Sequence, residues 1–455
     1  MFLERYRSHH DGERCLGTLL GRSRGRRLSG PQEMYPWSAV EAKLGEEPPA
    51  GGRPRGIYIH VPHCDRICRF CNLNRSERKG ADLDAYTAYL IDEIEMYGRQ
   101  PYVRGRPFDA VYFGGGTPTV LSAEQFSAVL TALRDAIPLK PDCEISVEST
   151  LHNLGPEKAA ALERGGVNRF SIGIQTFSDR GRETLGRTWD GGRALEQLRA
   201  LRAAFGGLLC LDIIYSYPGE TPEEVRYDAE CCAALPADSV SFYSLMVHPG
   251  SLLGESIAAG TTVFNRDTEY DRERHHLFYR GLRERGFELL ELSKLARPGR
   301  DRYQYIRVRY DNGDIIPIGA GAGGNIAGIP VYSMAPGKRF VSAPNPRYEG
   351  YHKILGYLQF GIYDVERITG ELYPLSPSGG EDRPRDAGPS PAALAIGERI
   401  RAYHRQGLLE ETLPGKSYRL SDDGVFWGNN IAVDLLTAAI QAETPGLPGP
   451  GEEEL

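Results

Sequence analysis

The sequence has no long apolar segment. No apolar run approaches the roughly 20 residues that a membrane-spanning helix requires. The first residues, MFLERYRSHHDGER, are charged throughout and lack the apolar centre of a signal peptide. We therefore predict a cytoplasmic protein without a membrane span.

An excess of positive charge is missing as well. The formal net charge is -7 at pH 7, which argues against a general affinity for nucleic acid. The basic cluster Arg22–Arg27 is interpreted as part of a solvated tail. Nucleic acid is therefore not among the predicted partners.

A disulfide framework is not expected from eight cysteines in 455 residues without a secretory signal. Five are scattered and are expected to be buried or inert: Cys15, Cys143, Cys210, Cys231 and Cys232. The other three, Cys64, Cys68 and Cys71, lie together in CDRICRFC with no fourth cysteine beside them. Three thiolates complete neither a tetrahedral zinc site nor an even set of disulfides.

What is present is a regular alternation of strands and helices after an extension of residues 1–54, which is rich in Gly, Arg and Pro. Six strand-like segments each precede a helical segment: 56–62, 109–113, 143–148, 168–175, 208–215 and 239–246. Such βα units imply a parallel sheet. We predict an α/β fold with a partial TIM-type (β/α)6 barrel over residues 55–290, with an open doubly wound sheet as the alternative. The barrel is favoured because the clustered cysteines, the GGGTPT segment, Glu148 and Gln175 all lie at the carboxyl ends of predicted strands. In βα barrels this end carries the chemistry.

Beyond the barrel, residues 291–350 contain strand-like pieces and a glycine-rich loop. Residues 351–440 are predicted to form a small helical, winged-helix-like domain, interrupted by PLSPSGGEDRPRDAGPSP. Residues 441–455 are expected to be a disordered tail.

The three clustered cysteines suit a [4Fe-4S] cubane, which normally takes four thiolates and with three keeps one iron open. An open iron beside a glycine-rich loop can bind the amino and carboxylate groups of S-adenosylmethionine and pass it an electron. A zinc site completed by His60 or His63 is an alternative, although zinc ligands usually come as two spaced couples. Three unrelated buried cysteines are a further alternative, opposed by the polar residues Asp65, Arg66 and Arg69 between them.

Several other residues fall at the same predicted edge of the barrel. In the GGGTP segment, Gly114–Pro118, missing side chains let the backbone approach a ligand. Asp212 and Gln175 can bond ribose hydroxyls, and Arg187 can meet a carboxylate with two parallel hydrogen bonds. Taken singly, each of these polar residues is more often a structural salt bridge or cap. The polar candidates are Glu148, Gln175, Arg187 and Asp212.

A second glycine-rich segment, GAGAGG at residues 319–324, fits the GxGxxG pattern of dinucleotide-binding loops. That pattern also needs a following helix and an acidic residue about 20 positions later. NIAGIPVYSMAPGKRF contains prolines, glycines and no acid, so nicotinamide binding is rejected.

The segments YIHVPHC, FGGGTPT, VNRFSIGIQTF, LGRTWD, DIIYSYPGE and IGAGAGG together resemble the radical S-adenosylmethionine superfamily, in its coproporphyrinogen III dehydrogenase-like branch. The resemblance covers about residues 56–440. It implies a [4Fe-4S] cluster on the three clustered cysteines, S-adenosylmethionine, and a low-potential electron donor such as flavodoxin or ferredoxin. By this resemblance Tyr58 and His60 tune or gate the cluster. The other implied contacts are with S-adenosylmethionine: Gly115, Gly116 and Thr117 at its methionine end, and Gly321 and Ala322 at a second molecule.

The resemblance also bears on the substrate, expected to be a tetrapyrrole, either haem or a porphyrinogen. Leu73 stands where coproporphyrinogen dehydrogenases carry a further cysteine, which counts against that oxidative decarboxylation. ELSKLARPGRDRYQY followed by GAGAGGNIAG is similar to anaerobic haem-degrading radical methyltransferases, although those enzymes usually have histidine at Lys294. Haem ring opening with methyl transfer is therefore predicted, with coproporphyrinogen III oxidative decarboxylation and a non-catalytic haem chaperone as the alternatives.

One loop offers groups for such a flat, acidic ligand. Arg300 and Arg302 can pair with propionates, and Tyr303 and Tyr305 can stack on a ring. A solvated basic loop is the alternative interpretation of the same residues.

Overall fold

The structure is a computed structural model that describes residues 35–71, 75–344, 346–372 and 389–443. It contains two compact units, of which the larger holds residues 35–288 and 293–344, and the smaller holds residues 289–292 and the described residues after 344. The basic cluster Arg22–Arg27, Leu73, the segment 373–388 and residues 444–455 lie outside the described residues.

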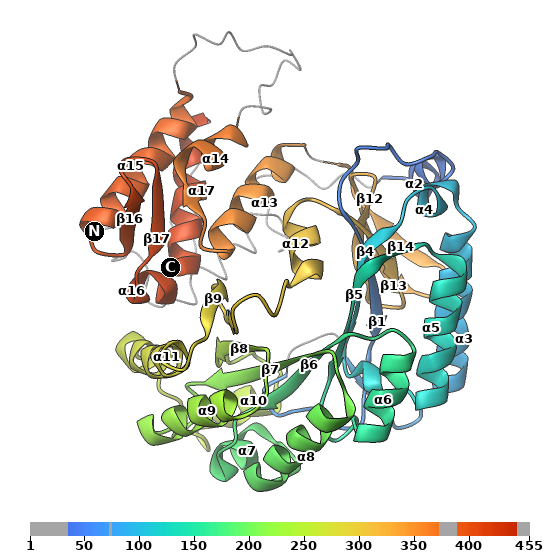
Figure 1. The fold of residues 1–455 in the computed structure, drawn as a ribbon, viewed down its shortest axis with the longest axis horizontal. Coiled ribbons are helices and arrows are strands. Elements are labelled where there is room, and N and C mark those ends of the chain that lie inside the picture. The colour runs from blue at the N-terminus through green and yellow to red at the C-terminus, as the bar shows by residue number, and fades with distance from the viewer. Residues whose placement is uncertain (1–34, 72–74, 345, 373–388, 444–455) are drawn as a thin grey trace. The chain divides into compact units, whose positions relative to one another are not determined.

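Six parallel strands form the centre of the larger unit, which confirms the predicted (β/α)6 arrangement (Figure 1). In sheet order they are β1 (Arg55–Val61), β4 (Phe108–Gly115), β5 (Leu139–Ser149), β6 (Arg169–Gln175), β7 (Leu208–Tyr215) and β8 (Ser239–Ser244). Every neighbouring pair among them is parallel. Their carboxyl ends therefore share one edge.

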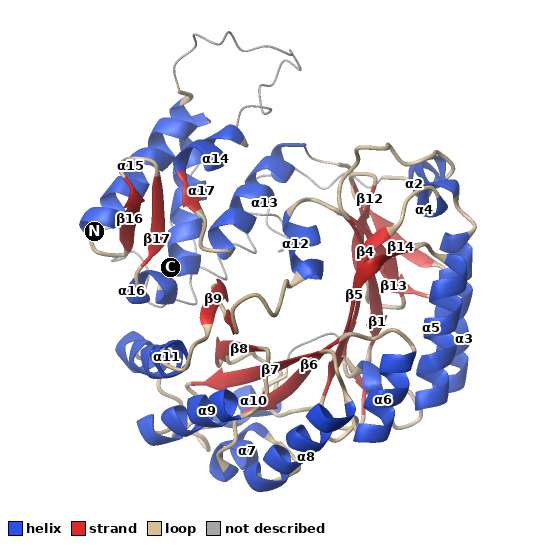
Figure 2. Cartoon of the chain, in the orientation of Figure 1, coloured by secondary structure: helices blue, strands red, loops and turns tan. Residues whose placement is uncertain are grey.

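Helices follow these strands and cover the outer face of the curved sheet (Figure 2). The main ones are α3 (Leu83–Gly98), α5 (Ala123–Ala136), α6 (Pro156–Arg164), α8 (Gly191–Ala204), α9 (Pro222–Ala234) and α11 (Thr268–Arg283). Shorter ones are α4 (Pro101–Arg104), the 3-10 helix η2 (Pro118–Val120), α7 (Asp179–Leu185) and α10 (Leu252–Ala258). Capping boxes begin α5 at Ser122 and α9 at Thr221, as the Ser-x-x-Gln and Thr-x-x-Glu spacings predict.

The strands form because apolar and polar residues alternate on their two faces. In β1, Ile57, Ile59 and Val61 are fully buried, and the intervening residues are Tyr58 and His60. Burying one apolar face under helices leaves the other face to line the barrel interior. The interior is therefore where polar side chains from neighbouring strands meet.

The sheet continues beyond the six strands on both sides. β11 (Asp314–Ile318) pairs parallel with β1, followed outward by antiparallel β12 (Gly323–Ile326), β13 (Ile329–Ala335) and β14 (Lys338–Val341). At the other side β10 (Lys294–Ala296) pairs antiparallel with β8. Between β10 and β11, α12 (Gln304–Tyr310) packs on the inner face of β4 and β1. Residues 293–344 are thus part of the larger unit.

Part of the predicted extension is ordered. α2 (Trp37–Leu44) contacts β12 and β14, and the Tyr35 backbone N–H donates to Val341 O at 3.0 Å. Residues 35–54 therefore lead into β1 against the sheet extension.

The smaller unit has helices around a short antiparallel sheet. Its elements are β9 (Glu288–Glu291), α13 (Pro346–Gln359), β15 (Tyr363–Asp364), α14 (Val365–Gly370), α15 (Pro391–Arg405), β16 (Leu409–Leu413), β17 (Ser417–Leu420), α16 (Asp422–Phe426) and α17 (Gly428–Glu443). β17 lies between β15 and β16. The helix–hairpin–helix order from α15 to α17 agrees with the predicted small helical domain. Within the described residues of both units, no helix has the length and apolar character to cross a membrane.

Candidate functional site

The loop that carries the three clustered cysteines is fixed to the carboxyl end of β1. β2 (His63–Cys64) pairs with β3 (Ser76–Glu77), and the Arg78 backbone N–H donates to Cys64 O at 2.7 Å. Both ends of the loop are thus held by backbone hydrogen bonds. The loop cannot swing away without breaking them.

The three sulfur atoms lie in a partly enclosed, donor-rich setting. Cys64 is buried, whereas Cys68 and Cys71 are partly exposed. Thr117 Oγ1 donates to Cys64 Sγ at 3.4 Å, and Arg187 Nη1 donates to Cys68 Sγ at 3.1 Å. Burial raises the pKa of the Cys64 thiol, the Thr117 hydrogen bond opposes that rise, and the neighbouring Cys71 and Cys68 add to it. The Cys64 thiol is therefore sensitive to charge on the other two sulfurs.

This donor set fits a [4Fe-4S] cubane. A cubane binds each thiolate to a different iron, so the sulfurs need not converge on one point, and hydrogen bonds to them tune its potential. Across the described residues, no three His, Cys, Asp or Glu side chains surround a single ion position. Tyr58 Oη contacts His60 Nδ1 at 3.0 Å, and His63 Nδ1 contacts Ser76 Oγ at 3.1 Å. The arrangement thus fits the cubane better than a zinc ion completed by either histidine.

The GGGTP segment passes directly beside this loop, and its glycines are required by close protein contacts. A Cβ on Gly116 would lie 2.7 Å from Pro62 O. A Cβ on Gly115 would lie 2.7 Å from His60 Cε1, and Gly115 has a φ of 115°, which side-chain-bearing residues rarely adopt. The glycines thereby let β4 end against the cysteine loop. Contacts within the protein, in addition to the predicted approach of a ligand, therefore account for the small size of these residues.

Gly115 is consequently the position where a methyl group should be most disruptive. We expect Gly115→Ala to lower the free energy of unfolding by roughly 2–4 kcal/mol, because it combines an unfavourable φ with overlap on the His60 ring. Urea unfolding measures the change. Gly51→Ala is the control, because a Cβ there meets nothing within 4 Å, and a change within about 0.5 kcal/mol is expected. Equal effects at the two positions would contradict this packing argument.

Glu148 lies next to the glycine segment at the end of β5. Its Oε1 accepts from Tyr112 Oη at 2.7 Å and its Oε2 from the Gly115 backbone N–H at 3.2 Å. Burial raises the pKa of Glu148 to about 7; the Tyr112 hydrogen bond opposes this rise and the nearby Asp212 adds to it. A carboxyl group poised near neutrality at a strand end is typical of a functional site.

Arg187 joins the cysteine loop to β6. Besides Cys68 Sγ, its guanidinium donates to Gly173 O through Nη2. Each of these nitrogens carries a second N–H, so the two-bond contact with a ligand carboxylate stays a prediction. Gln175, at the end of β6, has a φ of 75°, and the β6–β7 register shifts between Gly173 and Gln175.

Asp212 on β7 faces the same interior. Its carboxylate accepts from Ser171 Oγ, with distances of 3.1 and 3.3 Å to the two oxygens. It is only partly buried and influences Glu148 electrostatically. Asp212 and Glu148 therefore share one region of the barrel interior.

The second glycine-rich loop reaches the same edge through β11. The Gly319 backbone N–H donates to Glu93 Oε2 at 2.8 Å, and a Cβ on Gly319 would lie 2.5 Å from His60 O. The Gly321 N–H donates to Ser333 O at 2.7 Å, and Ala322 is fully buried. The loop therefore lies beside the carboxyl end of β1, where the cysteine loop also begins.

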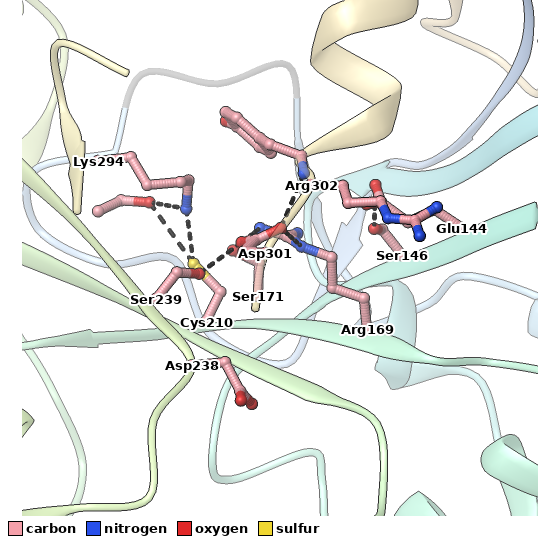
Figure 3. Close-up of polar contacts among 12 residues, drawn as sticks. Glu144, Ser146, Arg169, Ser171, Cys210, Asp238, Ser239, Lys294, Asp301 and Arg302 are labelled. Atoms are coloured by element: carbon pink, nitrogen blue, oxygen red, sulfur yellow. Dashed lines mark hydrogen bonds and ion pairs between the residues drawn. The ribbon is translucent and has the colours of Figure 1, made fainter. Parts of the chain in front are cut away.

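A buried polar cluster deeper in the barrel was not identified from the sequence (Figure 3). Lys294 Nζ donates to Cys210 Sγ at 2.7 Å and to Ser241 Oγ at 2.5 Å. Arg169 and Asp301 form an ion pair of 2.9 Å that is almost completely removed from solvent. A signal was present, because period-two alternation points Arg169 inward from β6 and Cys210 inward from β7. The cluster braces the strands below the site.

Arg300 and Arg302, which the sequence predicts to pair with propionates, both form ion pairs within the protein, whereas stacking of Tyr303 and Tyr305 on a ligand ring stays a prediction. Arg300 pairs with Asp238 and Arg302 with Asp142, which precede or begin β8 and β5 at the amino ends of the strands. Tyr305 is buried and stacks on Tyr112 with ring centroids 4.7 Å apart. Arg300 and Arg302 thus lie at the end of the barrel opposite the cysteines, whereas Tyr305 reaches towards Glu148. The alternative of a solvated basic loop holds for Arg300 and Arg302, whose side chains are 53% and 74% exposed in their ion pairs.

Comparisons with known proteins agree with this geometry. Residues 58–232 match the family model described as the radical SAM superfamily. Anaerobilin synthase of Escherichia coli O157:H7 is 29% identical over 399 residues, covering 85% of this chain and 84% of that protein. The heme chaperone HemW of Escherichia coli K12 is 31% identical over 279 residues, covering 60% of this chain and 70% of that protein. The solved coproporphyrinogen III oxidase (HemN) of Escherichia coli shares the fold, with a TM-score of 0.69, 19% identity, and coverage of 89% of this chain and 94% of that one.

Proposed function

Because the chain belongs to the radical S-adenosylmethionine superfamily, in its coproporphyrinogen III oxidase-like family, we propose that it opens the haem ring without oxygen and transfers a methyl group. The observation that carries the proposal is the cysteine loop, with three thiols at the carboxyl edge of a βα barrel. The similarity to anaerobilin synthase supports the choice of substrate because it extends along 85% of this chain.

In this proposal Cys64, Cys68 and Cys71 hold a [4Fe-4S] cluster, which supplies one electron to S-adenosylmethionine. Thr117 and Arg187 donate hydrogen bonds to two of the sulfurs and so stabilise them as thiolates. Tyr58 holds the His60 ring against Gly115, beside the start of the cysteine loop.

The remaining candidates bind and orient S-adenosylmethionine. Glu148, in its carboxylate form, accepts from the amino group at the methionine end, next to the backbone of Gly115, Gly116 and Thr117. Gln175 and Asp212 bond the ribose hydroxyls. Gly321 and Ala322 border a second S-adenosylmethionine, the methyl donor.

The reductant in this proposal is a protein of the flavodoxin or ferredoxin type. Two other functions stay open within the family. A non-catalytic haem chaperone is supported by the 31% identity to HemW. Oxidation of coproporphyrinogen III is the second, since the solved relative with the same fold has that activity.

One experiment separates these functions. The anaerobically reconstituted protein is incubated with S-adenosylmethionine, a low-potential reductant and haem, and 5'-deoxyadenosine and the Soret band are followed together. We expect 5'-deoxyadenosine to accumulate as the Soret band disappears. Haem binding with neither change would favour the chaperone, and product from coproporphyrinogen alone would overturn the haem assignment.

A further inference from the structure

Three tyrosines from distant parts of the chain stack inside the barrel beneath the glycine segment. Tyr112 and Tyr305 have ring centroids 4.7 Å apart at an interplanar angle of 23°. Tyr58 stacks on both, at 6.3 Å from Tyr112 and 6.2 Å from Tyr305. Tyr305 comes from α12, so this helix supplies the base on which the tyrosines of β1 and β4 rest. Aromatic pairs at such distances add to the stabilisation that burial gives.

Two of the phenol groups hold polar side chains that both touch Gly115. Tyr112 Oη donates to Glu148 Oε1 at 2.7 Å, while Glu148 Oε2 accepts from the Gly115 N–H. Tyr58 Oη contacts His60 Nδ1, and the His60 ring lies against Gly115. Burial raises the pKa of Tyr112 well above its ordinary value, so this phenol keeps its proton and serves as a donor.

We propose that Tyr112, seated on Tyr305, is the positioning residue that fixes the Glu148 carboxylate and sets the pH range over which the site accepts an amino-bearing ligand. The inference rests on the proposed function in that the ligand is S-adenosylmethionine. Tyr112 supplies the only side-chain hydrogen bond to Glu148 that the described residues show. The other donor is the Gly115 backbone N–H, which substitutions of Tyr112 leave in place.

The groups facing Glu148 come from five elements: Tyr58, Tyr112, Arg169, Asp212 and Tyr305. Burial and Asp212 favour the neutral acid, whereas Tyr112, Gly115 N–H and Arg169 favour the carboxylate. A hydrogen bond donated to the charged form lowers a carboxyl pKa. Removing the Tyr112 hydroxyl therefore raises the pKa of Glu148, and the carboxylate then forms only at higher pH.

The test compares Tyr112→Phe with Tyr305→Phe in the protein that contains its cluster. Binding of S-adenosylmethionine is measured by equilibrium dialysis between pH 6 and 9, without reductant. The pH at which binding is half-maximal should be about one unit higher in Tyr112→Phe than in the wild type. Near pH 7 its affinity should be several-fold weaker, and at pH 9 the two should agree. Tyr305→Phe keeps the ring and should leave the midpoint in place. The amino group of the ligand titrates identically in all samples. A difference between the affinity–pH profiles of the variants therefore comes from a titrating group of the protein.

A second readout does not depend on any ligand. Infrared spectra of the protein without ligand are recorded as a function of pH, and the carboxyl band of Glu148 is identified by its loss in Glu148→Gln. The pH midpoint of this band should be about one unit higher in Tyr112→Phe than in the wild type. An unmoved band, or an affinity loss equal at every pH, would overturn the positioning role. If the wild type does not bind S-adenosylmethionine but the band still shifts in Tyr112→Phe, the ligand assignment is refuted. The effect of Tyr112 on Glu148 is then still supported.

Discussion

Replacing Cys68 by alanine is expected to abolish S-adenosylmethionine cleavage and to deplete the protein of iron. Two thiolates cannot secure a cubane that already has one iron without a protein ligand, so iron should fall from about four atoms per chain towards zero. The Arg187 guanidinium, which donates to Cys68 Sγ at 3.1 Å, would also lose its sulfur partner. Iron analysis and 5'-deoxyadenosine formation, both under anaerobic conditions, measure the two effects.

Cys231→Ala on α9 is the matched control. Burial raises the pKa of Cys231 to about 11, so it stays a protonated thiol at neutral pH and is unsuited to bind a metal. This variant should keep full iron content and activity. Retention of iron and turnover by Cys68→Ala would refute the assignment of the cluster to this loop.

Asp301→Asn is expected to destabilise the larger unit by about 3–5 kcal/mol, because it leaves the Arg169 guanidinium buried without a counter-charge. The side chains of Arg169 and Asp301 are 1% and 0% exposed. Asp301 also accepts from Ser239 Oγ at 2.5 Å and from the Tyr303 N–H at 2.9 Å. Urea unfolding followed by circular dichroism measures the loss.

The adjacent pair of Arg302 and Asp142 provides the control, since its side chains are 74% and 65% exposed. Arg302→Ala should change the free energy of unfolding by less than about 1 kcal/mol. The double variant Arg169→Met/Asp301→Leu should recover much of the loss, because an apolar pair leaves no buried charge. A loss below about 1 kcal/mol in Asp301→Asn would contradict the buried-pair argument.

The same pair has a predictable pH dependence. Burial alone would raise the pKa of Asp301, but Arg169 and Lys294 hold it well below its usual range. A depressed pKa gives stability that is present above the unfolded-state value of about 3.9 and is lost as pH falls towards the folded-state value. The difference between wild type and Asp301→Asn should therefore be constant near neutrality and shrink below about pH 4.

Local patterns in the sequence were sufficient to predict the barrel strands and the cysteine loop. Period-two alternation in β1 and the glycines after β4 depend on neighbours only a few residues away. The spacing of Cys64, Cys68 and Cys71 likewise needs no knowledge of the fold. These features follow from chemistry that is local in the chain.

What could not be predicted depends on contacts between distant segments. Arg300 and Arg302 have the composition of a ligand-binding loop, and only the pairing of β10 with β8 and of β11 with β1 places them at the opposite end of the barrel. The Tyr112–Glu148 hydrogen bond depends on the register of β4 against β5. A single sequence does not reveal such registers.

The pairing of β1 with β11 also has a consequence for biosynthesis. Arg55 lies opposite Asp314, roughly 260 positions later in the chain. At the usual translation rate of about 5–20 residues per second, roughly 13–50 s pass between the synthesis of Arg55 and that of Asp314. Throughout this interval β1 lacks its partner strand on one side, and the cysteine loop that follows β1 is attached to an incomplete sheet. Metal loading is therefore best delayed until translation has finished.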